Sequence, residues 1–446
     1  MGISHSINRR LSPMEKSQWL ADQQCCSNFL SHAHFIGPLN EAILQKALDV
    51  LQARHPLLRV RIAREGRNNA KFISDSAPTI PIRLARSISG KWTEDAEREL
   101  NTRFSAERAP LMRCVLIQHD NEQHTVLLSF HHAIGDGLSG AYLMRDLFSS
   151  ADAILGGKNP SLPPMEPMKA METYFPNWVK GARGRLVHLG FMANYIGLEL
   201  KRERPACLKR DGWAPFEKRS VHIHALKIQG SVLEKLHLRA KHYRTTVHGA
   251  MLAAMILAMA RDLDLKNPGL FSVGSPVNLR KHLQPLIGDD VGFFVAMGFS
   301  TNSAKRDTAF WPLARNTRQF LYQCVEKGIP LVLDYFHKDL DIIPMVFGTG
   351  RMGARIYSAI LNKMTKSMPG FSNIGRLSFL MSTKRLQIDS IGFAASGSVM
   401  TNLATFAATA GDLTTWNFVG MAPLYTRKHI QKIARDSLDI LEAQAN

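Results

Sequence analysis

The sequence has 446 residues, of which 45% are hydrophobic and 21% are charged, a composition typical of globular proteins and unlike that of disordered or fibrous chains. Its 56 Lys and Arg residues against 37 Asp and Glu give a formal net charge of +19, which favours an anionic partner: nucleic acid, an anionic membrane, or an acidic or phosphorylated carrier. The basic residues are scattered and show no zinc-finger, RNA-binding or basic-region spacing, so we expect no nucleic-acid partner.

Helical and extended patterns alternate in the first third of the chain. Apolar residues recur at helical spacing over 40–54, and Pro56 ends this helix ahead of an alternating strand. A second helical pattern covers residues 94–104. The segment 110–130 consists of two apolar runs around a short polar turn, which predicts a hairpin. Residues 137–155 are again helical in pattern.

A change in composition suggests where the chain divides. The stretch "GGKNPSLPPMEPM" at 156–168 is rich in Gly and Pro and predicts a linker. The strand "SVHIHALKI" then opens a new unit, followed by a helix for which Ser231 and Glu234 have capping-box spacing. We therefore predict three parts: a first lobe over 1–155, a connector over 156–215 and a second lobe over 216–446.

The connector contains an uncharged run, "LVHLGFMANYIGL" at 186–198, which is flanked by basic residues. The run is shorter than the ~20 residues that a helix needs to cross a bilayer, so we expect no membrane span. Two interpretations remain open for it. We favour a helix packed across the two lobes over a helix that rests on a membrane surface holding a lipid acceptor.

The stretch "LLSFHHAIGDGLSG" at 127–140 ends an apolar run in two adjacent histidines and places Asp136 between two glycines. The glycines favour a sharp turn after the strand. Because consecutive strand residues point to opposite faces, His131 and His132 cannot both face one cavity. A neutral imidazole is a natural general base, and Asp136 either contacts it or fixes the loop by pairing with a remote arginine. The pattern also fits core and surface residues without a catalytic role.

The segment "HHAIGDG" resembles the HHxxxDG signature of the chloramphenicol-acetyltransferase-like superfamily, which includes condensation domains, polyketide-associated acyltransferases and wax ester synthases. Other segments agree with it in order and spacing: "LSPMEKSQWL", "FSAERAPLMRCVLI", "VGSPVNLRKHL" and "GFSNIGRL". The resemblance implies an α/β (α+β) fold of two chloramphenicol-acetyltransferase-like lobes, each a mixed sheet flanked by helices, with an active-site tunnel between them. The plant branch is disfavoured, because "WNFVGMAPLY" stands where that branch has DFGWG.

The resemblance also implies roles for individual residues. His132 would be the catalytic base facing the tunnel, and His131 would support the loop. Asp136 would hold the loop by pairing with Arg280, for which a solvated surface position is the alternative. Further residues would serve the substrate or the oxyanion, through close backbone access or hydrogen-bond donation: Gly137, Ser372 and Asn373.

The function that the resemblance implies is that of a stand-alone acyltransferase in lipid or specialised-metabolite biosynthesis. It would move an acyl group from acyl-CoA or a phosphopantetheinyl acyl carrier protein, as co-substrate, to a hydroxyl or amine, without a permanently bound cofactor or a metal. Two alternatives stay open: a free-standing condensation enzyme that forms an amide in nonribosomal peptide assembly, and a catalytically idle docking module. Five cysteines without C-x-x-C or metal-ligand spacing predict a reducing, cytoplasmic location, and we expect a monomer that has an optional peripheral membrane contact.

Overall fold

The computed structural model describes residues 6–75, 77–86, 91–119, 122–200, 205–365, 368–380, 383–397 and 399–445. Helices and strands alternate in the first part of the chain as the sequence predicts, including the helix over 40–54 and the hairpin before the motif. The elements of this part are β1 (Asn8–Arg10), α1 (Pro13–Asp22), β2 (Asn28–Ile36), α2 (Glu41–Arg54), β3 (Val60–Glu65), β4 (Asn69–Ser74), β5 (Ile82–Arg86), α3 (Trp92–Asn101), β6 (Met112–Gln118), β7 (Gln123–His131) and α4 (Gly137–Leu155).

The second part of the chain adds more helices than strands. Its elements are α5 (Asn177–Lys180), α6 (Ala182–Leu200), β8 (Ser220–Gln229), α7 (Gly230–His242), α8 (Val247–Asp262), β9 (Gly269–Asn278), β10 (Val295–Ala304), α9 (Phe310–Glu326), α10 (Ile329–Phe336), α11 (Ile342–Phe347), α12 (Arg351–Thr365), β11 (Gly370–Arg376), β12 (Gln387–Ala395), β13 (Leu403–Ala410), β14 (Leu413–Ala422) and α13 (Arg427–Ala443). Short 3-10 turns link several of them.

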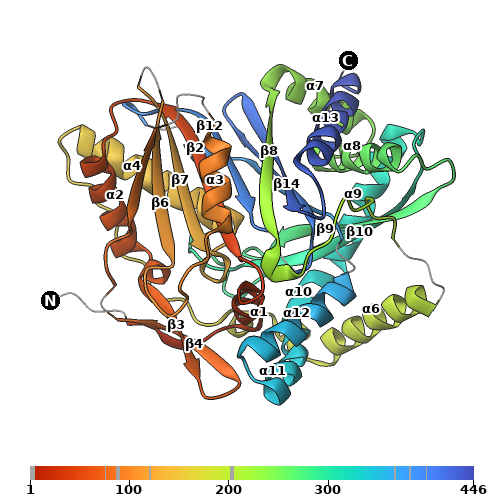
Figure 1. Cartoon of the computed structure of the whole chain (residues 1–446), viewed down its shortest axis with the longest axis horizontal. Coiled ribbons are helices and arrows are strands. Elements are labelled where there is room, and N and C mark those ends of the chain that lie inside the picture. Colours follow the sequence, from red (N-terminus) through yellow and green to blue (C-terminus); the bar gives the residue numbers. More distant parts are fainter. Residues whose placement is uncertain are drawn as a thin grey trace.

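Two large mixed sheets organise the molecule (Figure 1). The first has the strand order β12-β2-β7-β6-β5, and the second has the order β10-β9-β11-β13-β14-β8. In the first sheet β5 pairs parallel with β6, and in the second β11 pairs parallel with both β13 and β9; the other pairs are antiparallel. A small sheet of order β1-β4-β3 lies below the first. We call the elements around the first and second large sheets the first and second lobes.

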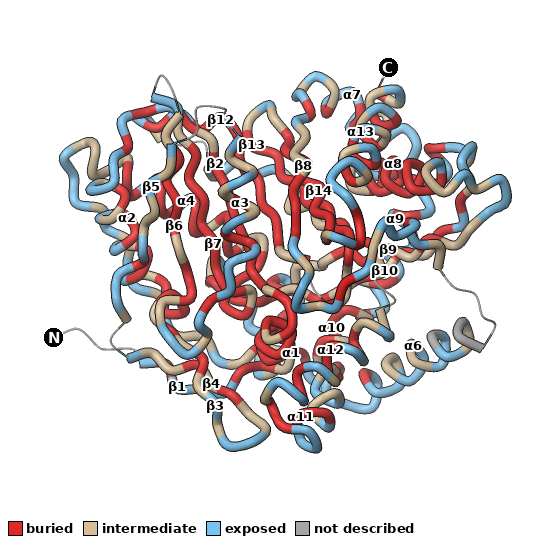
Figure 2. Tube along the Cα trace, in the orientation of Figure 1, coloured by how far each residue is buried: buried red, intermediate tan, exposed pale blue. Residues whose placement is uncertain are grey.

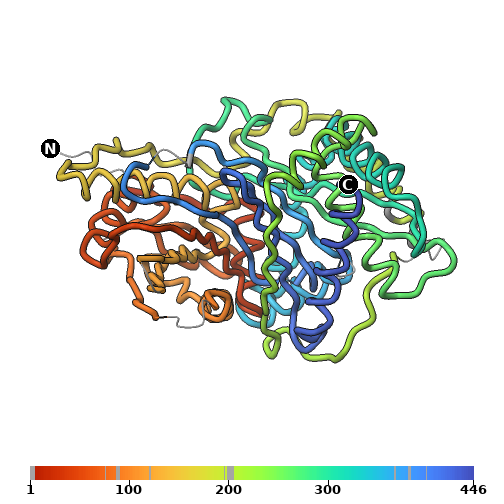
Figure 3. The backbone as a smooth tube through the Cα atoms, turned by 90° about the horizontal axis from the view of Figure 1, so that it is seen from above, coloured from red at the N-terminus to blue at the C-terminus, as the bar shows by residue number. Residues whose placement is uncertain are grey.

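The chain returns to the first lobe near its end. β12, drawn blue in Figure 1, pairs antiparallel with the red β2 and forms the edge of the first sheet. The predicted boundaries at 155 and 215 did not include such a return, and the division into three parts stays a prediction. Figure 3 shows the red to orange and the green to cyan parts on opposite sides, with blue C-terminal strands between them.

The lobes are joined by hydrogen bonds between β12, β2 and β14. The Asn417 side-chain amide donates to His32 Nε2 at 3.0 Å and to the Phe393 carbonyl at 2.9 Å. The Thr415 hydroxyl donates to the Ile391 carbonyl at 2.8 Å. Because these hydrogen bonds are buried and join strands of both lobes, they define the relative position of the two lobes at the centre of the molecule.

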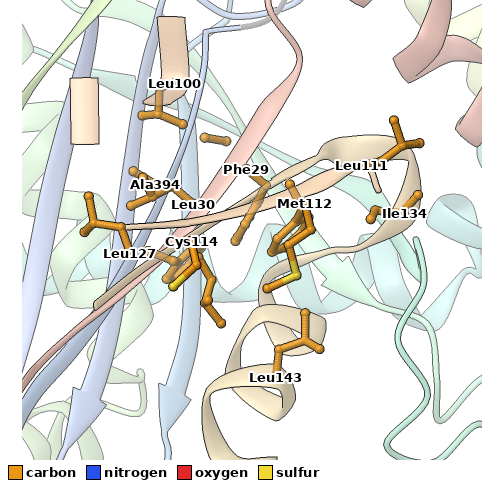
Figure 4. Packing of buried hydrophobic residues seen from close by; sticks show 14 of the residues in the cluster. Phe29, Leu30, Leu100, Leu111, Met112, Cys114, Leu127, Ile134, Leu143 and Ala394 are labelled. Atoms are coloured by element: carbon orange, nitrogen blue, oxygen red, sulfur yellow. The ribbon is translucent and has the colours of Figure 1, made fainter. Parts of the chain in front are cut away.

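Buried residues follow the strands of both large sheets (Figure 2). β7 is buried on both faces over its last seven residues, so these residues are mostly apolar and do not alternate strictly between apolar and polar. Figure 4 shows Phe29 of β2 and Met112 of β6 packed near Leu143 of α4. In the second lobe, α8 is buried all round from Gly249 to Ala260, which explains its almost entirely apolar sequence.

Two expectations about local structure are wrong. Ser231 does not cap a helix, because α7 begins at Gly230 directly after β8 and the residue before it, Gln229, makes no side-chain capping bond. α6 does not pack across the two lobes; it contacts α5 and α10 and lies at the edge of the second lobe (Figure 1). Among the described residues, no helix combines the length and the apolar character that a bilayer span requires.

Candidate active site

The motif occupies a tight turn between β7 and α4. His131 ends the strand, residues 132–134 form one 3-10 turn, and Asp136 is the N-cap of α4. The His132 amide donates to the Ser27 carbonyl at 2.8 Å, which ties the turn to the chain before β2. A Cβ at Gly135 would lie 2.8 Å from the Phe130 ring, so the close return of the backbone requires glycine there.

The His132 side chain is held in one tautomer. Its Nδ1 lies 2.9 Å from the Gly135 carbonyl oxygen. A carbonyl can only accept a hydrogen bond, so in the neutral ring Nδ1 carries the proton and Nε2 carries the lone pair. The half-buried ring lies between Phe29 and Phe293, with centroid distances of 5.1 Å and 5.2 Å.

Burial lowers the pKa of His132, while the bond to Gly135 and the charge of Asp136 act in the opposite direction. The net pKa lies below the ordinary value of 6.5, so the imidazole is neutral near pH 7. A neutral ring with a free Nε2 lone pair is the form that a general base requires.

His131 points elsewhere, as the alternation of a strand predicts. It is fully buried, its Nδ1 accepts a hydrogen bond from the Ala133 amide at 3.1 Å, and its Nε2 lies 3.9 Å from the Asp22 carboxylate. Burial lowers the pKa of His131, and the charge of Asp22 opposes this shift. Asp22 also accepts from the Ser27 amide at 2.8 Å, so it supports the turn from α1. No pattern in the sequence marks Asp22 for this position.

Asp136 is fully buried and does not hydrogen-bond the imidazole of His132 among the described contacts. It accepts from the Ser139 amide at 2.8 Å, from the Phe294 amide at 2.9 Å and from Arg280, whose Nη1 lies 2.9 Å from Oδ2 and Nη2 3.2 Å from Oδ1. Burial would raise the pKa of Asp136, but the charge and hydrogen bonds of Arg280 and the two amides outweigh it and lower that pKa. The geometry is that of a loop-fixing carboxylate.

Arg280 is only 2% exposed, so the solvated alternative for this residue is wrong. Besides Asp136, its Nη2 donates to the Ser139 hydroxyl and the Asp290 carbonyl, each at 3.0 Å. Its guanidinium lies 4.7 Å from the centroid of the Phe294 ring. Ser139 was not singled out from the sequence, although its place three residues after the N-cap is a recognisable capping position.

Gly137 lies close to side chains of other elements. A Cβ there would lie 3.1 Å from Ile374 Cγ2 and 3.5 Å from the Phe393 ring, so the absence of a side chain lets the start of α4 approach β11 and β12 closely. This contact brings the first turn of the helix after the motif against the second lobe. The predicted close access of substrate to the Gly137 backbone stays a prediction.

Ser372 and Asn373 lie on opposite faces of β11. Asn373 Oδ1 accepts from the Gly375 amide at 2.8 Å, and its Nδ2 lies 4.0 Å from Met251 Sδ, on the side covered by α8. Ser372 alternates with it and therefore shares the face of Ile374, which contacts the start of α4. The structure thus brings Ser372, and not the Asn373 side chain, to the side of the motif. Among the described residues, no cluster of three or more His, Cys, Asp or Glu has metal-site geometry.

The sequence of residues 11–332 matches the family model described as Condensation domain. The chain belongs to the condensation domain family. It is 27% identical over 274 residues to chondramide synthase cmdD from Chondromyces crocatus, a match that covers 58% of this chain and 6% of that protein. The chain thus spans a small fraction of the length of this relative. Membership of the family supports a transferase role.

Solved structures show the same fold over nearly the whole chain. The TRI3 trichothecene 15-O-acetyltransferase from Fusarium sporotrichioides matches with a TM-score of 0.73 and 14% identity, covering 100% of this chain and 97% of that one. The first condensation domain of the calcium-dependent antibiotic synthetase matches with a TM-score of 0.71 and 16% identity, covering 99% and 97%. The predicted condensation-type fold, with two chloramphenicol-acetyltransferase-like lobes, is confirmed.

Proposed function

We propose that this condensation-type protein transfers an acyl group from a thioester to an amine or hydroxyl acceptor, with His132 as the general base. The observation that carries the proposal is the hydrogen bond between His132 Nδ1 and the Gly135 carbonyl, which leaves Nε2 as the proton acceptor. The ring is half-buried between two phenylalanines, so it is partly shielded from water and remains accessible to a substrate.

The reaction needs no covalent bond to the protein. Nε2 takes the proton of the acceptor as its nitrogen or oxygen attacks the thioester carbonyl. The new C–N or C–O bond forms first, the C–S bond then breaks, and the leaving thiolate takes the proton back from the His132 imidazolium. The negative charge of the nearby Asp136 favours the imidazolium electrostatically. Asp136 and Arg280 act as positioning residues, because their bonds hold the turn that carries His132.

The oxyanion that forms during attack requires a hydrogen-bond donor. We assign this role to Ser372, because its side chain lies on the face of β11 that contacts the start of α4. The half-buried Ser372 hydroxyl has no hydrogen-bond partner among the described residues, so it is free to donate to a substrate.

Two further parts of the proposal concern the acyl donor and the bond formed in the product. Condensation domains act on carrier-bound substrates, which supports a phosphopantetheinyl carrier as donor, and the net charge of +19 suits an acidic carrier as well as CoA. A relative named as a nonribosomal peptide synthetase, kk1B from Curvularia clavata, supports an amide product. The structural likeness to an O-acetyltransferase supports an ester at the level of the fold alone.

The test is thiol release from a panel of acyl-CoA thioesters and from the same acyl groups on a phosphopantetheinyl carrier. Each donor is offered with a mixture of amines and a mixture of alcohols, and mass spectrometry identifies the product. His132→Ala is compared with His237→Ala, which changes an exposed histidine on α7. Release that only His132→Ala abolishes supports the proposal. Equal slow release by both variants and the wild type would contradict it and favour the docking-module alternative.

A further inference from the structure

α6 contacts the rest of the protein along one narrow stripe. His188 stacks on Phe336 of α10 with ring centroids 4.6 Å apart, and Phe191 lies 6.0 Å from Phe299 of β10. Val187 packs against the same apolar cluster. These positions recur at spacings of three and four residues, so they occupy one face of the helix.

The opposite face of α6 is also apolar. Leu186, Leu189 and Ile196 are 69%, 57% and 51% exposed, and Gly190 and Ala193 lie between them at the same helical spacing. We call these five residues the outer stripe; at 100° per residue it lies on the far side of the helix from the contact stripe. Surface helices of globular proteins normally place charged and polar residues there. Residues 186–198 contain no charged side chain.

The charges of this segment gather at its ends. Arg183 and Arg185 are exposed in the first turn of α6, and the sequence continues as "KRER" at 201–204, outside the described residues. An apolar stripe with cations beside it complements the surface of an anionic bilayer, where apolar side chains enter the headgroup region and arginines meet lipid phosphates. The middle of the stripe offers no charge or hydrogen-bond donor to an acidic protein partner.

A second apolar surface lies at the same edge of the molecule. Its large side chains are between 46% and 67% exposed: Ile342, Met345, Val346 and Phe347 of α11, and Met352 of α12. Arg67 donates to the Val346 carbonyl at 3.1 Å, and the exposed Arg351 and Arg355 follow α11. In Figure 1, α11 and α6 both lie along the lower edge of the molecule, and Figure 2 shows exposed segments there. We call the five apolar residues the α11 tip.

We propose that the outer stripe of α6 and the α11 tip bind the surface of an anionic membrane. Contiguous exposed apolar side chains are uncommon on soluble proteins unless they meet a partner. This inference goes beyond the proposed acyl transfer: it places the protein at a lipid surface, where a long-chain acyl donor or a lipid acceptor would be held.

The test measures co-sedimentation of the full chain with vesicles. The probes are phosphatidylcholine vesicles and vesicles of phosphatidylcholine mixed equally with phosphatidylglycerol. We expect binding to the mixed vesicles, at least ~10-fold weaker binding to pure phosphatidylcholine, and weaker binding at high salt. Leu186→Glu combined with Leu189→Glu should weaken binding to the mixed vesicles by at least ~10-fold, and Phe347→Glu should also weaken it. The matched control is Leu238→Glu, because Leu238 is 67% exposed on α7 at the upper side of Figure 1.

Other occupants of this surface give distinguishable results. Vesicle binding that the α6 variant leaves unchanged, or no vesicle binding by the wild type, would overturn the proposal. Dimerisation in light scattering that the α6 variant abolishes, without vesicle binding, would overturn it in favour of a second copy. Thiol release from a soluble acyl thioester is measured on the same variants, and loss of vesicle binding with release retained supports the proposal. Failure of the acyl-transfer proposal itself would leave the vesicle result unaffected.

Discussion

Asp136 and Arg280, 144 positions apart in the chain, form a fully buried two-point ion pair. Asp136 caps the helix that follows the motif, and Arg280 lies two residues after the end of β9 in the second lobe. The pair therefore ties the turn that carries His132 to the opposite lobe. Its charges are compensated inside the protein, which makes each partner depend on the other.

Removal of one partner should be strongly destabilising. Arg280→Met leaves the Asp136 carboxylate buried without its cation, and we expect the free energy of unfolding to fall by about 3–5 kcal/mol. Urea denaturation followed by circular dichroism measures the loss. The control is Arg306→Met, which breaks an exposed ion pair with Asp264 and should change the free energy of unfolding by less than about 1 kcal/mol. Equal effects of the two substitutions would contradict the importance of the buried pair.

His132→Ala should remove catalysis and spare the fold. A general base contributes about 10²- to 10⁴-fold to rate, so kcat should fall by that order in the thiol-release assay. His132 is half-buried and its described side-chain hydrogen bond runs to Gly135, so the urea midpoint should stay close to that of the wild type. If kcat fell only because the urea midpoint of the variant were lower, the result would contradict a role of His132 in the reaction.

The pH dependence of kcat/KM should report the lowered pKa of His132. The base is active when neutral, so activity is lost as the pH falls through that pKa, which lies below 6.5. Asp136→Asn removes a charge that raises this pKa, so the acid limb should move to still lower pH in the variant. An acid limb at or above pH 6.5 in the wild type, or an upward shift in the variant, would contradict this account.

The close approach at Gly137 can be tested with a double-mutant cycle. Gly137→Ala places a methyl group 3.1 Å from Ile374 Cγ2, and we expect about 1–3 kcal/mol of destabilisation from overpacking. Ile374→Ala removes the opposing atom and should relieve part of this loss in the double variant, although it has a cost of its own. Unfolding free energies of the four proteins give the coupling. Strict additivity would show that the two residues do not constrain each other.

Ser372→Ala and Asn373→Ala form a matched pair on neighbouring positions of β11. If the Ser372 hydroxyl donates to the oxyanion, its removal should lower kcat by about 10²- to 10³-fold with little change in KM. Asn373→Ala should change stability rather than kcat, because the Asn373 side chain bonds the Gly375 amide on the α8 side of the strand. The reverse order of the two effects on kcat would transfer the proposed role to Asn373.

The sequence determined the parts of this site that depend on neighbours in the chain. The apolar run of β7, the glycines of the turn and the N-cap position of Asp136 follow from short-range rules of strand burial, close backbone packing and capping. Alternation along a strand was enough to separate His131 from His132. The same local reasoning failed at Ser231, because the direct transition from β8 into α7 left no capping position for it.

Only the tertiary structure decided which distant groups meet. The resemblance suggested Arg280 as a partner, but its burial against Asp136, Ser139 and Phe294 depends on the packing of both lobes. The support from Asp22, the return of β12 to the first sheet and the orientation of Ser372 toward α4 have no local signal. Long-range contacts form where whole faces of helices and sheets bury one another, and a single side chain's nearest neighbours in sequence do not contain that information.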